Sequence, residues 1–266
     1  MFDRTRFSAA LASASLLPLL LAGCAGGPTR GPSGSPLPDL VSGNWQISSS
    51  TPAAVHLPAI SGTLAGSSAA ITGVLHTQTA SACTNPSNSF EVSGAADKNG
   101  NVTLSGSLAG GQLTVTGSLA ADGKSLEEAT YTVAGGTCAL ATSVKATAAV
   151  YSSLNGTYAG NFSDSDGQVA TVQATFSQSS PNANGDYTIT GSATPVNNPC
   201  FTGTVPLTNT LVTGNTFTFT YTDPASSNSV TATGTFSADA SSLSVGSWTS
   251  SGSCGPDAGT GTLTKQ

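Results

Sequence analysis

Apolar and polar residues alternate along most of the chain after residue 40. Between Val102 and Leu108, for example, apolar residues are separated by Thr and Ser. A period of two predicts strands that bury one face. Turn signals recur at strand-length intervals, so we expect about eight strands in each half of the chain. These signals are Asn99-Gly100, Gly110-Gly111, Asp122-Gly123, Asp166-Gly167, Asn184-Gly185 and Gly214-Asn215.

The second half of the chain repeats the first. A shift of 117 residues places the segment TVTGSLAADGKSL (114–126) on TATGTFSADASSL (231–243). The same shift places Cys83 on Cys200, and Cys138 falls one residue short of Cys254. Internal similarity of this kind indicates two copies of one fold. We therefore predict two β domains, residues 40–150 and residues 151–266.

Glycine takes the place of an apolar residue on the predicted inner face of several strands. Glycines at such positions let strands coil tightly and make room for large neighbours. Each copy is therefore predicted to be all-β and antiparallel, with a small up-and-down barrel favoured over a sandwich. The glycines concerned are Gly62, Gly73, Gly106, Gly117, Gly191 and Gly234.

Both copies open with a similar short motif. Gly43 and Trp45 form a Gly-x-Trp motif that resembles the first strand of lipocalin-like barrels, and Gly156 and Tyr158 fit it with Tyr for Trp. The resemblance implies that Trp45 packs across the closed end of its barrel. Lipocalins also bring a basic residue from near the last strand over this Trp. Lys145 is the candidate in the first copy, and we expect no equivalent in the second.

The chain begins like an exported protein. Arg4 and Arg6 precede an apolar run over residues 9–21, which is the layout of a signal peptide over residues 1–23 and is too short to span a bilayer. The run ends in Leu21-Ala22-Gly23-Cys24, which resembles the lipobox of bacterial lipoproteins. The alternative is an ordinary cleaved signal peptide followed by a chance cysteine.

The resemblance implies a covalent lipid on Cys24. In that family the thiol receives diacylglycerol, the chain is cut before the cysteine, and the new amine is often acylated, commonly with palmitate. Two or three acyl chains anchor a protein stably. Ala25, rather than Asp, follows the cysteine, which by resemblance implies the outer membrane over the inner one. Residues 24–39 are then the lipidated cysteine and a Gly/Pro/Ser tether.

Four cysteines remain after Cys24, in an oxidising compartment. Three pairings are possible, and the duplication favours Cys83 with Cys138 and Cys200 with Cys254. The first cysteine of each pair precedes the fourth predicted strand and the second precedes the eighth, so each bridge would cross one end of its domain. Zinc binding is the alternative, although the sequence has no CxxC pair.

Charge argues against a nucleic-acid partner. Removing residues 1–23 leaves 5 basic and 12 acidic side chains, a net charge of −7. A chain with this balance does not suit a phosphate backbone. No Lys or Arg occurs between Lys145 and Lys265, where six Asp occur. We interpret these Asp as a solvated acidic surface rather than as a cation site.

The sequence offers little for catalysis. His56 and His76 are the two histidines, and neither stands in a triad or zinc motif. The pair Glu127-Glu128 is expected to face opposite sides of a strand. The segments 97–100 and 164–167 resemble fragments of calcium loops but are interpreted as hairpin turns. We therefore expect no enzyme activity, no metal and no cofactor besides the lipid.

Two functions remain open. In the first, the protein is a non-catalytic binding module for a small apolar or glycan ligand held in a barrel lumen. The alternative is a structural or adhesive surface protein without a small ligand, favoured by low charge, tandem copies and the tether. Four aromatic residues are expected in the core, with sugar stacking as the alternative: Phe217, Phe219, Tyr221 and Trp248.

Overall fold

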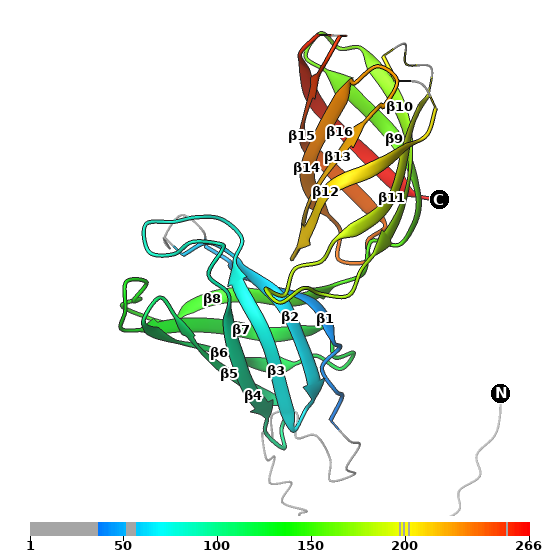
Figure 1. Cartoon of the computed structure of the whole chain (residues 1–266). Helices are drawn as coiled ribbons and strands as arrows, with labels where there is room; N and C mark the ends of the chain where they lie inside the picture. Colours follow the sequence, from blue (N-terminus) through cyan, green and yellow to red (C-terminus); the bar gives the residue numbers. More distant parts are fainter. Residues whose placement is uncertain (1–36, 52–56, 197, 199, 202, 254) are drawn as a thin grey trace, which may run out of the picture. The chain divides into compact units, whose positions relative to one another are not determined.

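The chain forms two closed antiparallel β-barrels in tandem (Figure 1). The computed structural model describes residues 37–51, 57–196, 198, 200–201, 203–253 and 255–266. Within these residues there are sixteen strands and no helix, eight strands in each barrel. The predicted fold class is thus confirmed, and the closed barrel rather than the sandwich is the architecture.

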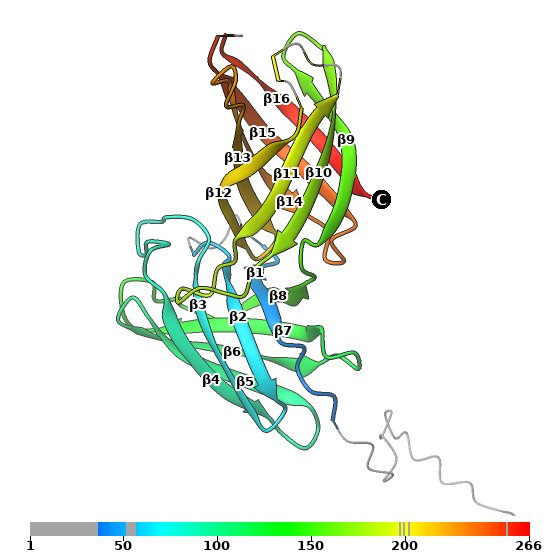
Figure 2. The same cartoon turned by 45° about the vertical axis from the view of Figure 1, so that its right-hand side comes forward.

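The first barrel is an up-and-down meander in which β1 closes the sheet against β8. Its sheet is drawn from blue to green in Figures 1 and 2. The strands are β1 (Gly43–Ser49), β2 (Ile60–Ser67), β3 (Ala70–Thr77), β4 (Phe90–Ala96), β5 (Asn101–Leu108), β6 (Gly111–Leu119), β7 (Ser125–Ala134) and β8 (Val144–Tyr151).

The second barrel has the same topology, with β9 closing against β16. Figure 2 shows its strands from a second side. The strands are β9 (Gly156–Asp164), β10 (Val169–Gln178), β11 (Ile189–Val196), β12 (Val205–Thr213), β13 (Thr216–Thr222), β14 (Ser229–Phe236), β15 (Ser242–Ser251) and β16 (Asp257–Lys265).

Inner-face glycines bring neighbouring strands close together. A Cβ at Gly62 would run into the backbone carbonyl of Val74 on β3, and one at Gly234 into that of Ser244 on β15. Both glycines continue the row of buried side chains on their strands, as Leu64 does beside Gly62. The prediction that glycine permits tight coiling is confirmed at these positions.

The two cores differ in chemistry although the topology is the same. In the first barrel the buried aromatic residues are Trp45 and Tyr131, and the remainder of the core is mainly aliphatic. In the second barrel the core is dominated by aromatic rings, and the prediction that Phe217, Phe219 and Tyr221 belong to it is confirmed. The buried rings there are Tyr158, Phe162, Phe176, Tyr187, Phe201, Phe217, Phe219, Tyr221 and Phe236.

Strand register shows which residues of the first barrel correspond to the rings of β13. Val102 on β5 lies opposite Gly117, and Phe217 on β13 lies opposite Gly234. Gly117 and Gly234 are equivalent in the duplication, so Phe217 occupies the place of Val102. By the same register three rings of β13 replace smaller residues of β5: Phe217 for Val102, Phe219 for Leu104 and Tyr221 for Gly106.

The opening motifs place an aromatic side chain with a polar tip in each core. Trp45 is fully buried, and its indole Nε1 donates a hydrogen bond to the carbonyl of Val41 at 2.8 Å. Tyr158 is also fully buried, and its hydroxyl donates to the carbonyl of Ala240 at 2.8 Å. A buried ring whose polar tip is satisfied fits these positions.

The expectations about basic residues were wrong in both copies. The second copy has one: Nζ of Lys265, at the end of β16, lies 6.0 Å from the centroid of the Tyr158 ring. Lys145 does not take this place in the first copy. Its carbonyl accepts a hydrogen bond from Ser50, beyond the far end of β1, whereas Trp45 pairs with Val150. Lys145 is therefore five residues along β8 from Val150, the residue that pairs with Trp45.

Residues 37–266 form one compact unit, within which the two barrels share hydrogen bonds. The turn between β12 and β13 contributes most of them. The side chain of Asn44 on β1 donates to the carbonyl of Gly214 at 2.6 Å and accepts from its N–H at 2.8 Å. Thr213 bonds to Ser61, with 2.7 Å between the hydroxyl oxygens. We call this set of contacts the junction.

Candidate functional site

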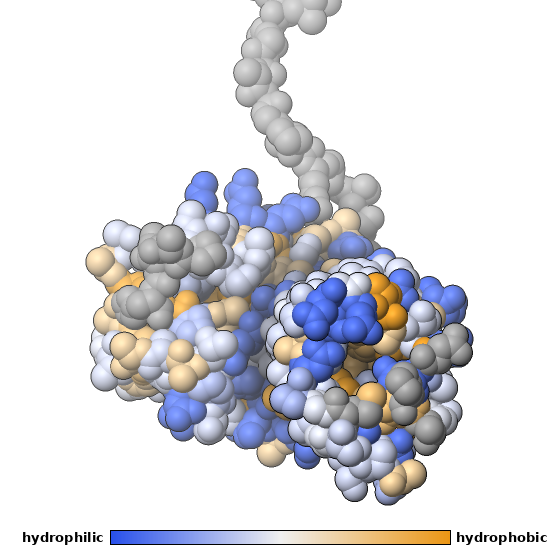
Figure 3. Space-filling view, turned by 90° about the horizontal axis from the view of Figure 1, so that it is seen from above, coloured by the Kyte–Doolittle hydropathy of each residue, from blue (hydrophilic) through white to orange (hydrophobic). Residues whose placement is uncertain are grey.

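The second barrel contains a cavity of about 100 Å³ at one end. This end carries the β11–β12, β13–β14 and β15–β16 connections. Figure 3 views the molecule from above, and hydrophobic surface (orange) is visible there among hydrophilic side chains (blue). The apolar and aromatic lining residues are Phe162, Ala170, Val172, Pro195, Cys200, Phe201, Tyr221, Val230 and Trp248, and the polar ones are Asn198, Asn228, Ser250, Ser251 and Asp257.

Aromatic rings from four different segments form the walls. Phe162 on β9 and Trp248 on β15 meet edge to face, with ring centroids 6.4 Å apart. Phe201 and Tyr221 meet in the same manner, with centroids 5.3 Å apart. Edge-to-face pairs hold each other in place, and their faces offer apolar contact to a third ring. The rings therefore form an apolar part of the wall, and Asn, Ser and Asp residues complete it.

Tyr221 brings a polar group to this apolar site. The residue is only 3% exposed, and it lines the cavity. Burial raises the pKa of Tyr221 well above the ordinary value of 10.0, so the hydroxyl keeps its proton. Among the described residues, the buried side-chain atoms without a hydrogen-bond partner are Oγ1 of Thr77 and the Tyr131 hydroxyl, and the Tyr221 hydroxyl is not one of them. A ligand that covered the Tyr221 hydroxyl without accepting from it would leave a donor unpaired.

Two side chains fasten the rim. Asn228, in the β13–β14 connection, donates to the carbonyl of Cys200 at 2.7 Å and accepts from Ser253 at 3.2 Å. The indole of Trp248 donates to the carbonyl of Thr260 on β16 at 3.2 Å. Because these bonds tie neighbouring connections and strands together, the rim is held without help from a ligand.

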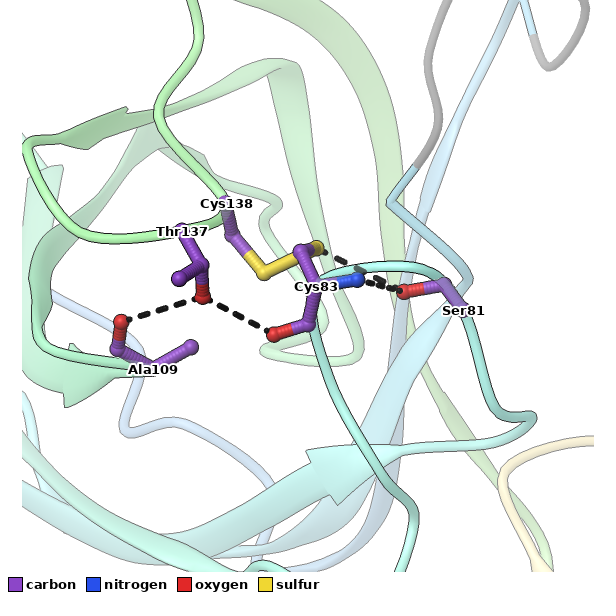
Figure 4. The surroundings of a disulfide bond; sticks show 5 residues. All are labelled: Ser81, Cys83, Ala109, Thr137 and Cys138. Atoms are coloured by element: carbon purple, nitrogen blue, oxygen red, sulfur yellow. Dashed lines mark hydrogen bonds between the residues drawn. A yellow bond between two sulfur atoms is a disulfide. The ribbon is translucent and has the colours of Figure 1, made fainter.

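The predicted disulfide of the first copy is confirmed: Cys83 is bonded to Cys138, with their Cα atoms 5.1 Å apart (Figure 4). Cys83 lies between β3 and β4 and Cys138 between β7 and β8, as expected. The hydroxyl of Thr137 donates to the carbonyl of Cys83 at 3.1 Å, and that of Ser81 accepts from the N–H of Cys83 at 3.3 Å. The bridge and these bonds join two connections at one end of the barrel.

The second predicted disulfide is described in part. Cys200 is disulfide-bonded and lines the cavity. Cys254 lies outside the described residues, so the pairing of Cys200 with Cys254 stays a prediction. Cys24, the signal peptide and most of the tether also lie outside the described residues. Lipidation of Cys24 therefore stays a prediction.

Of the two histidines, His56 lies outside the described residues. His76, on β3, is buried at the junction, where its Nε2 lies 2.6 Å from Oδ1 of Asp186 and 3.2 Å from the hydroxyl of Thr213. This position is on the opposite barrel from the cavity walls, so His76 is not part of the candidate site.

The expected orientation of Glu127 and Glu128 was wrong. Both side chains are exposed, because a β-bulge interrupts the pairing of β7 with β6 and gives Glu128 a φ of +49°. A bulge adds one residue to a strand and so breaks the alternation of faces. The two carboxylates share the outer surface and lie away from the core.

The two calcium-like segments are hairpin turns, as interpreted from the sequence. Oδ1 of Asp97 accepts the N–H groups of Asn99 and Asn101, at 2.8 and 2.9 Å. Oδ1 of Asp164 accepts those of Asp166 and Gln168, at 3.0 and 2.7 Å. These carboxylates are used by their own turns. Within the described part of the chain no group of three or more His, Cys, Asp or Glu side chains suits a metal ion.

Sequence reasoning missed the cavity itself. A usable signal was present, since one strand of the second copy carries rings where the first copy carries Val, Leu and Gly. Such a difference between copies of one fold indicates that the two barrel interiors are filled by different side chains. The prediction that Trp248 belongs to the core holds in part, because its ring is half-buried and lines the cavity.

No helix within the described residues is long and apolar enough to cross a membrane. No family model matches the chain, and no curated protein matches it. Among solved structures the chain is similar to EF1p2_mFAP2b bound to DFHBI, with 19% identity and a TM-score of 0.32 over 42% of this chain and 94% of that one. It is also similar to a redesigned β-barrel, mFAP1, bound to DFHBI, with 24% identity and a TM-score of 0.29 over the same shares. These likenesses concern the barrel fold alone.

Proposed function

We propose that this chain is a non-catalytic, lipid-anchored envelope protein whose second barrel binds a small, largely apolar ligand. The observation that carries the ligand proposal is the cavity at one end of that barrel. Four aromatic residues form part of its walls, its rim is held by hydrogen bonds, and polar residues complete its lining. Concave apolar sites with a few polar groups are the usual form of small-molecule sites.

Size limits what can enter. A cavity of about 150 Å³ with apolar walls accepts benzene. The present cavity, at about 100 Å³, is smaller, so it suits the end of an aliphatic chain or part of one ring, with the remainder of the ligand at the mouth. Each apolar Å² removed from water stabilises the complex by about 25 cal/mol. A glycan fits less well, because each buried hydroxyl would need its own partner.

The second barrel is preferred because its cavity depends on residues that the first barrel lacks. Tyr221 stands where the first barrel has Gly106. Phe201 corresponds to Thr84 by the 117-residue shift. In this proposal the first barrel supports the second and joins it to the tether.

The chain offers a built-in test, because it has two tryptophans, one at the cavity and one far from it. Trp248 lines the cavity, whereas Trp45 is fully buried in the other barrel. We expect titration with a ring-sized probe such as acetophenone to shift the indole N–H signal of Trp248 in a nitrogen-15 correlation spectrum and to leave that of Trp45 in place. Trp248→Phe assigns the two signals.

A matched pair of variants then locates the binding site. Ala170 lines the cavity, whereas its neighbour Val169 is 61% exposed on the outer face of β10. We expect Ala170→Phe to abolish the saturable shift and Val169→Phe to retain it. Absence of saturable binding in the unmodified chain would remove the ligand proposal and favour a structural or adhesive role.

The anchor is the second part of the proposal. It is supported by the lipobox match at Leu21-Ala22-Gly23-Cys24 and by the Gly/Pro/Ser composition of the tether. Ala25 favours the outer membrane. With such an anchor the barrels would stay at the membrane surface while the cavity remained open to solvent.

A further inference from the structure

The groups around the cavity restrict the charge of its ligand, and this inference rests on the proposed function above. No Lys or Arg occurs between Lys145 and Lys265. Lys265 is the basic residue of the second barrel, and it lies at the opposite end of β16 from Asp257, eight residues or roughly 26 Å away along the strand. Its Nζ faces the Tyr158 ring.

Acidic groups stand at the mouth instead. Asp257 lines the cavity at the start of β16. Asp164 lies at the end of β9 opposite Gly259, and the N–H of Ser165 donates to the carbonyl of Ala258 at 3.1 Å. This contact brings the turn that carries Asp164 and Asp166 beside the mouth. A carboxylate or phosphate bound there would lose water, gain no cation and face like charges.

The Tyr221 hydroxyl supplies the other restriction. Tyr221 lines the cavity, and its hydroxyl is not among the buried atoms that lack a partner. A ligand that accepts its proton would keep this donor paired when water is displaced, whereas an entirely apolar ligand would leave it unpaired. The site therefore favours a molecule with an acceptor for this hydroxyl and an apolar remainder against the rings.

We infer that the cavity selects uncharged ring compounds that carry one hydrogen-bond acceptor for the Tyr221 hydroxyl, and that it rejects the acids of the same size. Ketones, aldehydes, esters and lactones built on a single ring belong to this class. Aromatic acids and fatty acids do not.

Three probes of matched size test the inference on the full chain: acetophenone, ethylbenzene and benzoate. Acetophenone is neutral with an acceptor, ethylbenzene is neutral without one, and benzoate is an anion. From the Trp248 signal we expect acetophenone to bind about three- to tenfold more tightly than ethylbenzene. We expect benzoate to bind at least about tenfold more weakly than acetophenone.

Two conservative variants assign these differences to residues. Tyr221→Phe should remove the preference for acetophenone over ethylbenzene while both still bind. Asp257→Asn should improve benzoate binding and leave ethylbenzene unchanged. Equal binding of all three probes would overturn this inference and leave the proposed function standing. Binding of none of them would overturn both.

Discussion

Nε2 of His76 in the first barrel lies 2.6 Å from Oδ1 of Asp186 in the second. Nδ1 of the same ring lies 3.0 Å from the carbonyl of Thr77, which can only accept, so Nδ1 carries a proton. When the ring is protonated, Nε2 also carries a proton, and this proton points to the carboxylate of Asp186. Burial lowers the pKa of His76, but the hydrogen bond and charge of Asp186 outweigh it and raise the pKa above 6.5.

This pair predicts a pH-dependent stability. A raised pKa in the folded state means that the contribution is fully present below the unfolded value of about 6.5, and is lost as the pH rises through the higher folded value. We therefore expect the free energy of unfolding to fall over that interval. Urea denaturation at a series of pH values measures it. His76→Gln should flatten the dependence and cost about 1–3 kcal/mol at acidic pH.

The junction also predicts unequal effects of one substitution at two glycines. Gly214 and Gly167 both lie in hairpin turns with positive φ, at +54° and +81°. A Cβ at Gly214 would lie 2.5 Å from the side chains of Gln46 and Gln78 in the other barrel, whereas one at Gly167 would meet nothing within 4 Å.

Both Gly→Ala changes therefore carry the backbone cost of about 1–2 kcal/mol. Gly214→Ala should carry a further 1–3 kcal/mol or so from overpacking. Thermal unfolding of the two variants gives the comparison. Equal losses would show that the turn does not pack against the first barrel in solution.

The Cys83–Cys138 bridge should be a large single contribution to the first barrel. It closes a loop with a sequence separation of 55, for which loop-closure entropy suggests about 4 kcal/mol as an upper figure. The double variant Cys83→Ala, Cys138→Ala should lose up to this amount in urea denaturation. Serine at both positions is the control for the added cavity.

Peptide mapping without reduction tests the second bridge. We expect Cys200 to be recovered with Cys254, because each copy of the duplication carries two cysteines at similar places. Recovery of Cys200 with Cys83 or Cys138 would contradict both the duplication argument and the bonding in the first barrel.

Lipidation has its own test in a bacterial host that processes lipoproteins. Growth with labelled palmitate should label the mature chain, and Cys24→Ser should abolish the label and release the protein from the membrane fraction. A labelled Cys24→Ser variant would place the lipid elsewhere. An unlabelled unmodified chain would favour an ordinary signal peptide.

The alternation of apolar and polar residues, the turn signals and the internal duplication sufficed to predict the strands, their number and the two tandem barrels. These features can be recognised in short segments of the sequence. The bulge at Glu128 was not predictable in this way, since one added residue leaves the composition of the strand unchanged. The partner of His76 was not predictable either, because Asp186 is 110 positions away and no spacing rule joins the two residues.

The candidate site depended on register. Tyr221 looks like any other core residue in an alternating strand, and its significance appears when strand pairing places it in the position of Gly106. Lys265 was overlooked because the last strand ends next to the beginning of the first, which is a property of closure. Contacts that arise only from closure carry no local signal.

Closure has a further consequence for a chain with 8% charged residues. Net negative charge repels neighbouring molecules, but charged side chains are too few to protect each strand, and Thr- and Val-rich segments readily add to a foreign sheet. In each barrel the first strand is bonded to the last, so neither sheet ends in an edge strand, and the shortest run of paired residues lies between β11 and β12, where Ser192 pairs with Pro206 and Ala193 with Val205. Closure therefore protects these molecules against edge-to-edge aggregation through geometry as well as through charge.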